Sequence, residues 1–389
     1  MNILSIETSC DETAVSLVEA NGDFPHATYT VRGDALFSQI DIHREYGGVF
    51  PNLAKREHAK TLVPMLEKAL AEASVLEKNN DTLSTETKSK LNKILEREPG
   101  LTESLVNFLE AYRQPPIDVI AVTSGPGLEP TLWVGINFAR ALSLVWDIPV
   151  VPVNHMEGHI LSSLFDGTNI PEIMFPAISL LISGGHTELV LMKDWMTYEL
   201  VGQTRDDAVG EAFDKVARML GLPYPGGPEI SRLADDARTK ELPSTVDLPR
   251  PMLDSNDCDF SFSGLKTAVR YHIDDTKLTD DERAALARDF EDTVTEVLLK
   301  KTRRAIDEYG ARTLIIGGGV SANQHIRTTF RTFFTEHYPM LTLYIPEQKL
   351  STDNSIMIAL AGHAHVQGAL TPSNSGSITA DGKLSLSKV

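Results

Sequence analysis

The chain has almost no cysteine. Cys10 and Cys258 are the two that occur in 389 residues, and they do not form a CxxC pair. Disulfide frameworks and thiolate zinc sites depend on clustered cysteines, so the sequence excludes both. Any bound metal must therefore be held by nitrogen and oxygen ligands.

Long apolar runs and basic residues are also scarce. No segment reaches the roughly 18 consecutive apolar residues that a membrane helix needs, and the opening stretch, MNILSIETSCDET, reads as a strand without a basic leader. Lys and Arg number 36 against 54 Asp and Glu, a formal net charge of -18. This charge disfavours broad affinity for nucleic acid, which would need a local basic patch. We therefore expect a cytoplasmic protein that is not bound to a membrane.

Length and pattern together indicate two α/β halves. A chain of 389 residues exceeds the size at which one core stops growing. Residues 2–18 and 177–192 each read as two β-rich runs around a small polar turn, and each pair is followed later by a strand, a glycine-rich turn and a helix. The repetition predicts an N-terminal half at 1–150, a C-terminal half at 151–370 and a flexible tail at 371–389.

A charge-rich stretch interrupts the first half at about 74–114. Short apolar stripes recur in it at helical spacing, for example Leu91, Ile94 and Leu95. We expect a helical insertion on the surface of this half, and the simplest interpretation gives it no catalytic role.

Glycine-rich turns follow strands in both halves, GPG at 125–127 and GGG at 317–319. Glycine lets the backbone approach a phosphate, and the N–H groups at a helix start favour an anion. One such turn alone is more often ordinary loop structure. Their paired repetition instead predicts a nucleotide or an adenylate in a cleft between the halves.

Two histidines, His155 and His159, stand four residues apart in VNHMEGH. On a helix they share a face and could bind one metal, with Asp353 of STDNS as a third ligand that would bridge the halves. The alternative for Asp353 is a helix N-cap. Two histidines and one carboxylate suit Fe(II), and Zn or Mn are also plausible. Glu157 falls on another face, unlike the glutamate of H-E-x-x-H peptidases, which disfavours proteolysis.

Motifs in a fixed order run from the first residues to about residue 361: ETSCDETAVSLV, EYGGVFPNLAKREH, SGPGLEPTLWVGINFARAL, VPVNHMEGH, LLISGGHTELV, DDAVGEAFDKVARMLGLPYPGGP, PRPM, DFSFSGLKTAV, GGGVSAN and STDNSIMIA. This set resembles the tRNA N6-adenosine threonylcarbamoyltransferases (TsaD type), formerly labelled O-sialoglycoprotein endopeptidases, in their bacterial and organellar branch. The resemblance implies the duplicated α/β fold of actin, Hsp70 and sugar kinases, with two RNase H-like halves around a central cleft.

The resemblance implies an acyltransferase that acts in tRNA processing. It would transfer threonylcarbamoyl from threonylcarbamoyl-adenylate to N6 of the adenosine 3′ to the anticodon, in tRNAs that read ANN codons, forming t6A and releasing AMP. Bacterial relatives also require an inactive paralogue and a small ATPase, whereas the mitochondrial type acts as a homodimer. Two basic clusters are candidates for contact with tRNA phosphates: Lys55, Arg56, His58 and Lys60, and then Lys300, Lys301, Arg303 and Arg304.

The same motifs imply the site residues. One divalent metal per subunit, Fe(II) before Zn, would be bound by His155, His159 and Asp353. The adenylate would be bound by Leu181, Ile182, Ser183, Gly184, Gly185, Asp214, Gly227 and Asn323. Backbone N–H groups of the LISGG turn could cradle a phosphate, and Asp214 could accept hydrogen bonds from ribose hydroxyls. Asp11 and Glu12 are candidates for proton transfer or for positioning. The alternative is that their side chains only form hydrogen bonds within an Asx turn or a cap.

Three other functions are compatible with parts of the sequence. A metallopeptidase would need a catalytic glutamate on the metal face. A small-molecule kinase on the same fold would use ATP and Mg²⁺ rather than a histidine-bound metal. An actin-like nucleotide-binding scaffold would have no need of an intact set of metal ligands.

Overall fold

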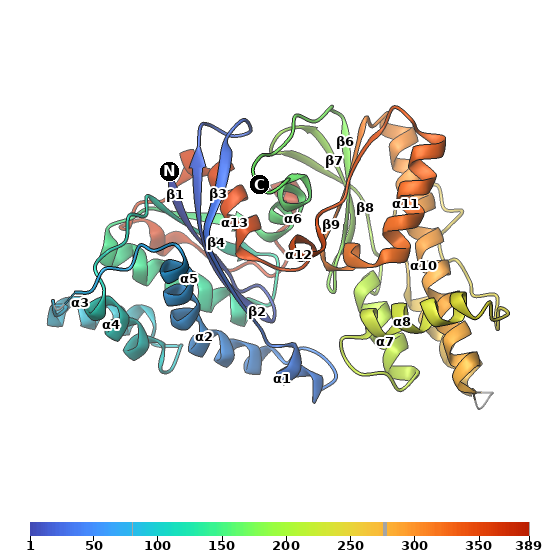
Figure 1. Ribbon diagram of the computed structural model, residues 1–389, viewed down its shortest axis with the longest axis horizontal. Coiled ribbons are helices and arrows are strands. Elements are labelled where there is room, and N and C mark those ends of the chain that lie inside the picture. The colour runs from blue at the N-terminus through green and yellow to red at the C-terminus, as the bar shows by residue number, and fades with distance from the viewer. Residues whose placement is uncertain (80, 275–277, 389) are drawn as a thin grey trace. The chain divides into compact units, whose positions relative to one another are not determined.

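The computed structural model describes residues 1–79, 81–274 and 278–388. The chain divides into two compact units. The first unit comprises Met1–Ile42, Val49–Glu172 and Asp353–Val389, and the second comprises His43–Gly48 and Ile173–Thr352. Each unit is built around one five-stranded sheet with helices packed on it (Figure 1).

The first unit carries strands β1 (Asn2–Glu7), β2 (Glu12–Asn21), β3 (Thr28–Ser38), β4 (Val119–Gly125) and β5 (Val150–Asn154). Its helices are α2 (Pro51–Glu72), α3 (Thr85–Ile94), α4 (Leu101–Ala111), α5 (Glu129–Trp146), α6 (His155–Leu164) and α13 (Ser355–Ala364), and α1 (Ile40–Arg44) lies at its border with the second unit. Short 3₁₀ turns follow at Val366–Gly368 (η2), Ser375–Ser377 (η3) and Leu386–Lys388 (η4).

The second unit carries strands β6 (Ala177–Ile182), β7 (Thr187–Asp194), β8 (Thr197–Gln203), β9 (Thr313–Gly317) and β10 (Thr342–Tyr344). Its helices are α7 (Val209–Met219), α8 (Gly226–Thr239), α9 (Ser263–Asp274), α10 (Asp280–Tyr309), α11 (Gln324–His337) and α12 (Gln348–Ser351), with a 3₁₀ turn η1 at Gly319–Ala322.

The two sheets have the same topology. The first sheet has the order β3-β2-β1-β4-β5, and the second has the order β8-β7-β6-β9-β10 when read in the same direction. In each, the first three strands form an antiparallel meander and the last two run parallel to the first strand. The structure thus confirms the internal duplication predicted from the sequence.

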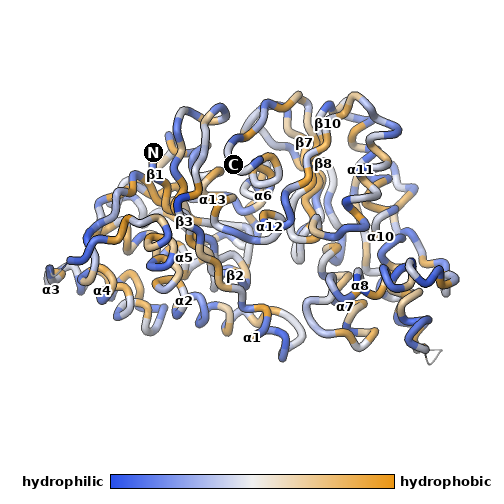
Figure 2. The backbone as a smooth tube through the Cα atoms, in the orientation of Figure 1, coloured by the Kyte–Doolittle hydropathy of each residue, from blue (hydrophilic) through white to orange (hydrophobic). Residues whose placement is uncertain are grey.

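Helices cover both faces of the first sheet, so its central strand β1 is buried from Ile3 to Glu7 and largely apolar (Figure 2), whereas the edge strand β3 alternates buried and exposed positions. Leu4 and Ile6 of β1 share a core cluster with Leu62 and Leu66 of α2. The opposite face packs against α13, where the Ser16 hydroxyl lies 2.5 Å from that of Ser355. Helix α13 therefore lies directly on the strands that end at the candidate site.

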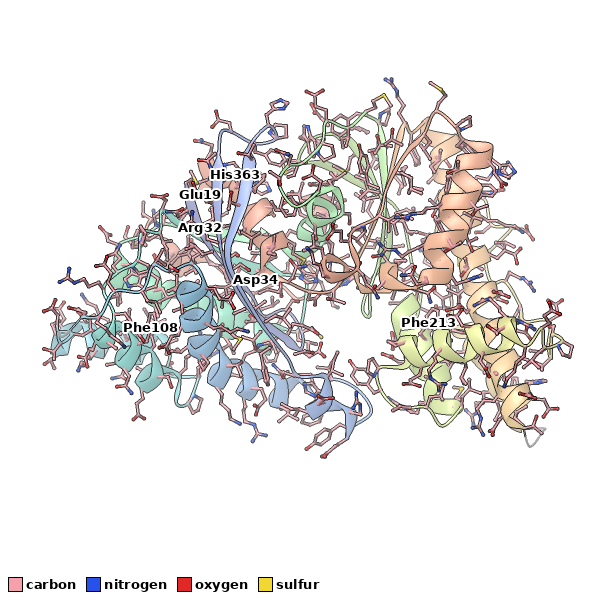
Figure 3. The ribbon with its side chains drawn as sticks, viewed as in Figure 1. Glu19, Arg32, Asp34, Phe108, Phe213 and His363 are labelled. Carbon is pink, nitrogen blue, oxygen red and sulfur yellow. The ribbon has the colours of Figure 1, made fainter. Side chains whose placement is uncertain are left out.

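The insertion forms two helices, α3 and α4, and Asn80 within it lies outside the described residues. Its apolar stripes are buried in the core of the first unit rather than exposed to solvent. Phe108 of α4, labelled in Figure 3, is 5% exposed and packs in this core. The insertion is therefore an integral layer of the first unit.

The two units do not coincide with the expected halves, which were predicted to end at residues 150 and 370. Residues 151–172 and 353–389 belong to the first unit because α6 and α13 pack on its sheet and on each other. The expected flexible tail also packs on this unit: the Asp381 N–H donates to the Ser124 carbonyl at 2.9 Å, and the Gly382 carbonyl accepts from the Gly127 N–H at 3.3 Å.

None of the helices in the described part of the chain has the length and apolar character required to cross a bilayer.

We expect Phe108→Ala to lower the free energy of unfolding by about 3 to 5 kcal/mol, because it leaves a cavity in a packed core. Asn107→Ala, at an exposed neighbouring position, is the control and should change it by less than about 0.5 kcal/mol. Urea unfolding followed by circular dichroism measures both. Equal effects of the two substitutions would contradict burial of the insertion.

Candidate functional site

Helix α6 begins where β5 ends, and Asn154 fixes that start. Its Oδ1 accepts hydrogen bonds from the backbone N–H groups of Met156 and Glu157 at 2.9 and 3.3 Å, as an N-cap side chain does. His155 and His159 follow one turn apart, with ring centroids 4.7 Å apart at an interplanar angle of 84°. The helix therefore presents both imidazoles on one face, as their spacing predicts.

Asp353 joins the two histidines. Its Oδ1 lies 3.1 Å from His159 Nε2 and 3.4 Å from His155 Nε2. The alternative role of Asp353 as an N-cap is wrong, because Asn354 caps α13 by accepting from the Met357 N–H at 3.0 Å. The carboxylate of Asp353 is thus available to the histidines.

All three residues belong to the first unit, so the expectation that Asp353 would bridge two halves is not met. The reason is the close packing of α13 on α6. A Cβ placed on Gly158 of α6 would lie 3.0 Å from Met357 Cγ and 3.3 Å from Ile358 Cδ1, so only glycine allows this approach without a shift.

The donor set fits a divalent metal. Two imidazole nitrogens and one carboxylate oxygen lie within 4.8 Å of one another. Histidine and carboxylate suit Fe(II), Zn and Mn, and three protein ligands would leave coordination positions for substrate. The arrangement can therefore hold a metal that acts as a Lewis acid.

Glu7, at the end of β1, supports His155 and was not predicted from the sequence. It is fully buried, and its Oε2 accepts from His155 Nδ1 at 3.0 Å and from the Thr123 hydroxyl at 2.6 Å. The Ser9 N–H donates to its other oxygen. With Nδ1 committed to Glu7, the Nε2 of His155 is the nitrogen left for a metal. One sequence feature could have indicated this role: Glu7 is the single charged residue of the strand NILSIE and stands at its end.

These buried charges stabilise one another. Burial opposes the charged form of His155, but Asp353 and Glu7 outweigh it and raise the pKa of His155 well above its usual range. Burial likewise favours a neutral Asp353, but His155 and His159 outweigh it and hold its pKa well below 3.8. The pKa of Glu7 is lowered for the same reason, burial being outweighed chiefly by His155. Without metal, the cluster is therefore charged near neutral pH.

Asp11 and Glu12 lie in or beside the β1–β2 turn that borders this cluster. The Ser9 hydroxyl of the same turn lies 3.5 Å from Asp353 Oδ2. Burial, followed by the charges of Asp11 and Asp353, raises the pKa of Glu12 well above its usual value. Neither residue is among the three grouped ligands.

The residues expected to bind an adenylate all lie in the second unit. Leu181 and Ile182 are fully buried in β6, so only their backbone could reach a ligand. Gly184 and Gly185 are exposed, and a Cβ on either would meet nothing within 4 Å. Ser183 accepts from the His186 N–H through its hydroxyl, at 3.1 Å. The turn thus presents open backbone after a buried strand.

The remaining adenylate candidates adjoin this turn through neighbouring elements. A Cβ on Gly210, at the start of α7, would lie 2.8 Å from Gly184 Cα. One turn along α7, Asp214 accepts from the Gly226 N–H at the start of α8, at 2.7 Å. Gly227 follows with open space around it.

In Asn323, the last of these candidates, both the oxygen and the nitrogen of the side-chain amide form hydrogen bonds within the protein. Its Oδ1 caps α11, and its Nδ2 donates to Ser231 Oγ and to Glu291 Oε1 at 2.8 and 2.7 Å. These bonds tie Asn323 to α8 and α10 rather than leaving its side chain open.

The two basic clusters are mostly committed to other contacts. His58 is fully buried and bonds to Thr13 and to the Cys10 carbonyl. Lys301 is 1% exposed and donates to Ser255 and Asp257. Three further members form ion pairs: Lys60 with Glu57, Lys300 with Glu296 and Arg303 with Asp307. His58 and Lys301 are therefore not available to phosphate, whereas the side chains of Lys60, Lys300 and Arg303 remain 65%, 53% and 56% exposed within their ion pairs.

A family profile described as "TsaD: tRNA N6-adenosine threonylcarbamoyltransferase" matches residues 30–84 and 101–360. Curated proteins named tRNA N6-adenosine threonylcarbamoyltransferase are similar over nearly the whole chain. That of Ralstonia pickettii is 42% identical over 372 residues, covering 94% of this chain and 92% of its own. That of Bacillus cereus is 41% identical over 369 residues, with the same coverage. That of Nitrosomonas eutropha is 40% identical over 384 residues, 97% of both chains.

Among solved structures, full-length HypF in its phosphate- and nucleotide-bound form shares the fold. The TM-score is 0.52 at 12% identity, over 94% of this chain and 46% of that one. Together with the duplicated sheets, this likeness assigns the two-lobed α/β fold of the actin, Hsp70 and sugar-kinase superfamily.

In the metal-free protein, Glu7→Gln should lower the pKa of His155, because the imidazolium loses a buried anionic neighbour. Titration of labelled histidine by NMR measures it, with Glu86→Gln, in an exposed ion pair with Lys90, as the control.

The same substitution should change the pH dependence of stability. The pKa of His155 is higher in the folded protein than in the unfolded chain, so protonation of His155 stabilises the fold. This stabilisation is fully present below pH 6.5 and is lost as the pH rises through the pKa of the folded state. Glu7→Gln should therefore destabilise the metal-free protein most at and below pH 6.5, down to the range where carboxylates protonate. A His155 pKa that does not move would contradict the assigned contact.

Proposed function

Because the chain belongs to the tRNA N6-adenosine threonylcarbamoyltransferase family, we propose that it transfers threonylcarbamoyl from threonylcarbamoyl-adenylate to N6 of the adenosine 3′ to the anticodon. In this reaction a bond forms between N6 and the carbamoyl carbon, the bond from that carbon to the phosphate oxygen breaks, AMP leaves, and N6 loses a proton. The observation that carries the proposal is the grouping of His155, His159 and Asp353 within 4.8 Å in a chain of this family.

Those three residues would hold one divalent metal, Fe(II) in preference to Zn. When bound, the metal would supply a Lewis acid for the carbonyl of the transferred group. Glu7 keeps Nδ1 of His155 occupied at 3.0 Å and so turns Nε2 toward Asp353. Ser9 contacts the other oxygen of Asp353 at 3.5 Å. These two residues position ligands and do not need to contact the substrate.

Asp11 and Glu12 are suited to take up the proton that N6 releases. Burial and the charges of Asp11 and Asp353 raise the pKa of Glu12 well above its usual value, which brings its basicity closer to that required near neutral pH. Both residues lie next to the ligand cluster within the first unit.

The small-residue turns of the second unit would bind the adenylate. The backbone at Gly184 and Gly185 has open space for a phosphate, as does the start of α8 at Gly227. The Ser183 N–H, in contrast, already donates to the His186 carbonyl at 2.9 Å. Asp214 lies between this turn and the start of α8, on α7, and would accept from the ribose. Leu181 and Ile182 would contribute through the backbone of β6, and Asn323 through its position beside α8.

The partner in the reaction is tRNA. We further propose that an inactive paralogue and a small ATPase assist this chain. Its formal net charge is -18, and members of the two basic clusters are paired or buried, so the chain offers little affinity for phosphate by itself. Peptidase activity is disfavoured because Glu157 is fully buried and bonds to His365 at 2.7 Å instead of facing the two histidines' ligand site.

The direct test is transfer of label from threonine, with bicarbonate, ATP, a threonylcarbamoyl-adenylate synthase and the two partner proteins, into unmodified tRNA. Wild type should label the tRNA. His159→Ala should reduce the rate by about 100-fold or more, since losing a metal ligand removes the Lewis acid. His26→Ala, at a side chain 71% exposed, is the matched control and should keep full activity. Absence of label with wild type in the complete system would refute the transferase.

Adenylate binding can be tested separately. Gly227→Val should fold normally, because a Cβ there meets nothing within 4 Å, yet it should weaken AMP binding by about tenfold or more by filling the space of the ligand. Gly227→Ala should have an intermediate effect. Calorimetric titration with AMP measures the affinity, and thermal unfolding checks the fold. Unchanged AMP affinity in the valine variant would remove Gly227 from the site.

A further inference from the structure

A buried carboxylate links three helices of the second unit. Glu291 of α10 is 0% exposed. Its Oε1 accepts from the Ser231 hydroxyl of α8 and from Nδ2 of Asn323, the N-cap of α11, both at 2.7 Å. Its Oε2 accepts from Nη1 of Arg238, also of α8, at 2.7 Å. Because α10 packs against both α8 and α11 (Figure 1), these bonds connect all three helices through one side chain.

The amide of Asn323 is held in one orientation by this network. Nδ2 donates to Glu291 Oε1 and to Ser231 Oγ, at 2.7 and 2.8 Å, and Oδ1 accepts from the Ile326 N–H at 3.0 Å. A flipped amide would set its oxygen against the carboxylate of Glu291 and its N–H₂ against the N–H of Ile326. Glu291 therefore decides which way the amide of Asn323 is turned.

The same carboxylate restrains α8, which carries Gly227 in its first turn. Ser231 and Arg238 attach this helix to Glu291 at two points, about two turns apart. Gly227 has open space around it and, like Asn323, is expected to contact the adenylate. Two elements of the adenylate site are thus anchored on one side chain.

Stability alone gives little reason for a buried ion pair at this place. Apolar residues of similar volume can often replace such a pair without loss of stability, because desolvation offsets the attraction of the charges. Burial opposes the charge of Arg238, but hydrogen bonds to Glu291 and Asp292 outweigh it and raise the pKa of the guanidinium. Glu291 is therefore matched by a charged donor, and apolar residues could not reproduce the directed bonds that it makes to Asn323 and α8.

We propose that Glu291 is a positioning residue of the adenylate site, which holds Asn323 and the first turn of α8 in the arrangement that binds the ligand. Its carboxylate is buried and bonded to three protein donors, so it acts through these elements and not by contact. The inference rests on the proposed function, because it takes Asn323 and Gly227 as adenylate-binding residues. Glu291 itself lies outside the sequence motifs that indicate the family.

Glu291→Gln keeps the shape of the side chain and removes its charge. The introduced amide can turn its oxygen toward either Arg238 or Asn323, and the charged guanidinium is the stronger donor. Its N–H₂ then faces the N–H₂ of Asn323, and because two donors cannot bond to each other, Asn323 is displaced. We expect AMP to bind the full chain about tenfold more weakly or worse, measured by calorimetric titration.

A second substitution in the same chain provides a rescue. When Arg238→Gln is added to Glu291→Gln, no guanidinium competes for the introduced amide oxygen, which can accept from Asn323 again. The double variant should therefore bind AMP within about threefold of wild type. Arg238→Met is the replacement if the first double variant does not fold. Asp235→Asn is the matched control, since it removes an ion pair of the same Arg238 at a side chain 70% exposed; it should change the affinity by less than about twofold.

Three results would overturn the inference. One is unchanged AMP affinity in Glu291→Gln, with thermal unfolding as the check of the fold. Another is a double variant that binds AMP as weakly as Glu291→Gln, because a merely structural loss is not rescued by a further substitution. Either of these leaves the adenylate site itself in place. The third is the absence of AMP binding by the wild-type chain, which would refute the adenylate site and with it this role of Glu291.

Discussion

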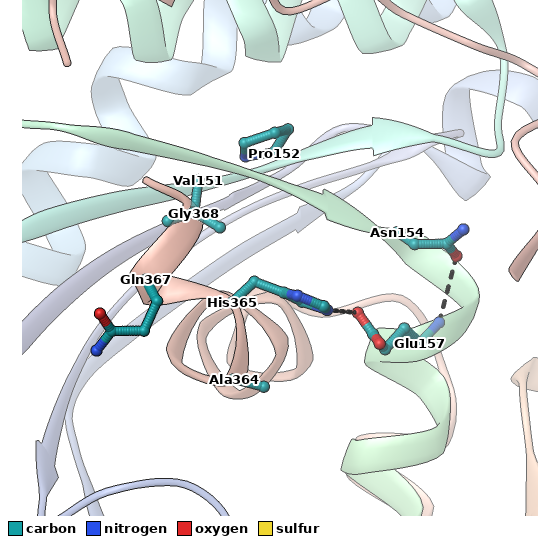
Figure 4. A pocket seen from close by; sticks show the side chains of 8 residues that line it. All are labelled: Val151, Pro152, Asn154, Glu157, Ala364, His365, Gln367 and Gly368. Atoms are coloured by element: carbon teal, nitrogen blue, oxygen red, sulfur yellow. Dashed lines mark hydrogen bonds and ion pairs between the residues drawn. The ribbon is translucent and has the colours of Figure 1, made fainter. Parts of the chain in front are cut away.

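The packing of α13 against α6 is the contact on which the functional features of the first unit depend. It is close because α6 has a glycine, Gly158, where a Cβ would come within 3.0 Å of Met357. At one side of this contact, Asp353 meets His155 and His159. Just beyond the end of α13, His365 bonds to Glu157 of α6 at 2.7 Å (Figure 4). One helix pair thus holds together both the three grouped ligands and the contact between Glu157 and His365.

Burial gives the cluster its rigidity as well as its electrostatics. A fully buried carboxylate such as Glu7 is costly unless hydrogen bonds and a counter-charge compensate it. Here Thr123, Ser9 and His155 supply both. Each of these bonds also restrains a group near the ligands, so the interactions that offset the cost of burial also fix the direction of Nε2 of His155. The same arrangement recurs where histidine ligands are held by carboxylates in other metal proteins.

The duplicated sheets have diverged in their turns. The β1–β2 turn of the first unit carries Ser9, Asp11 and Glu12, all polar and near a cluster of charges. The corresponding β6–β7 turn of the second unit carries Gly184 and Gly185, with open space around their backbone, between Ser183 and His186. One topology therefore offers acidic side chains in one unit and exposed glycine backbone in the other. The first suits metal and proton chemistry, and the second suits an anion.

The sequence by itself determined the duplication, the helical face shared by His155 and His159, and the family motifs, because these are properties of periodicity and of residue order along the chain. Tertiary structure decided which unit Asp353 joins, since that follows from α13 packing on α6 across nearly 200 residues. It also decided that Glu7 reaches His155, that Lys301 is buried, and that Glu157 bonds to His365. Local patterns specify the direction of a side chain within its own element, whereas its partners depend on how separate elements pack.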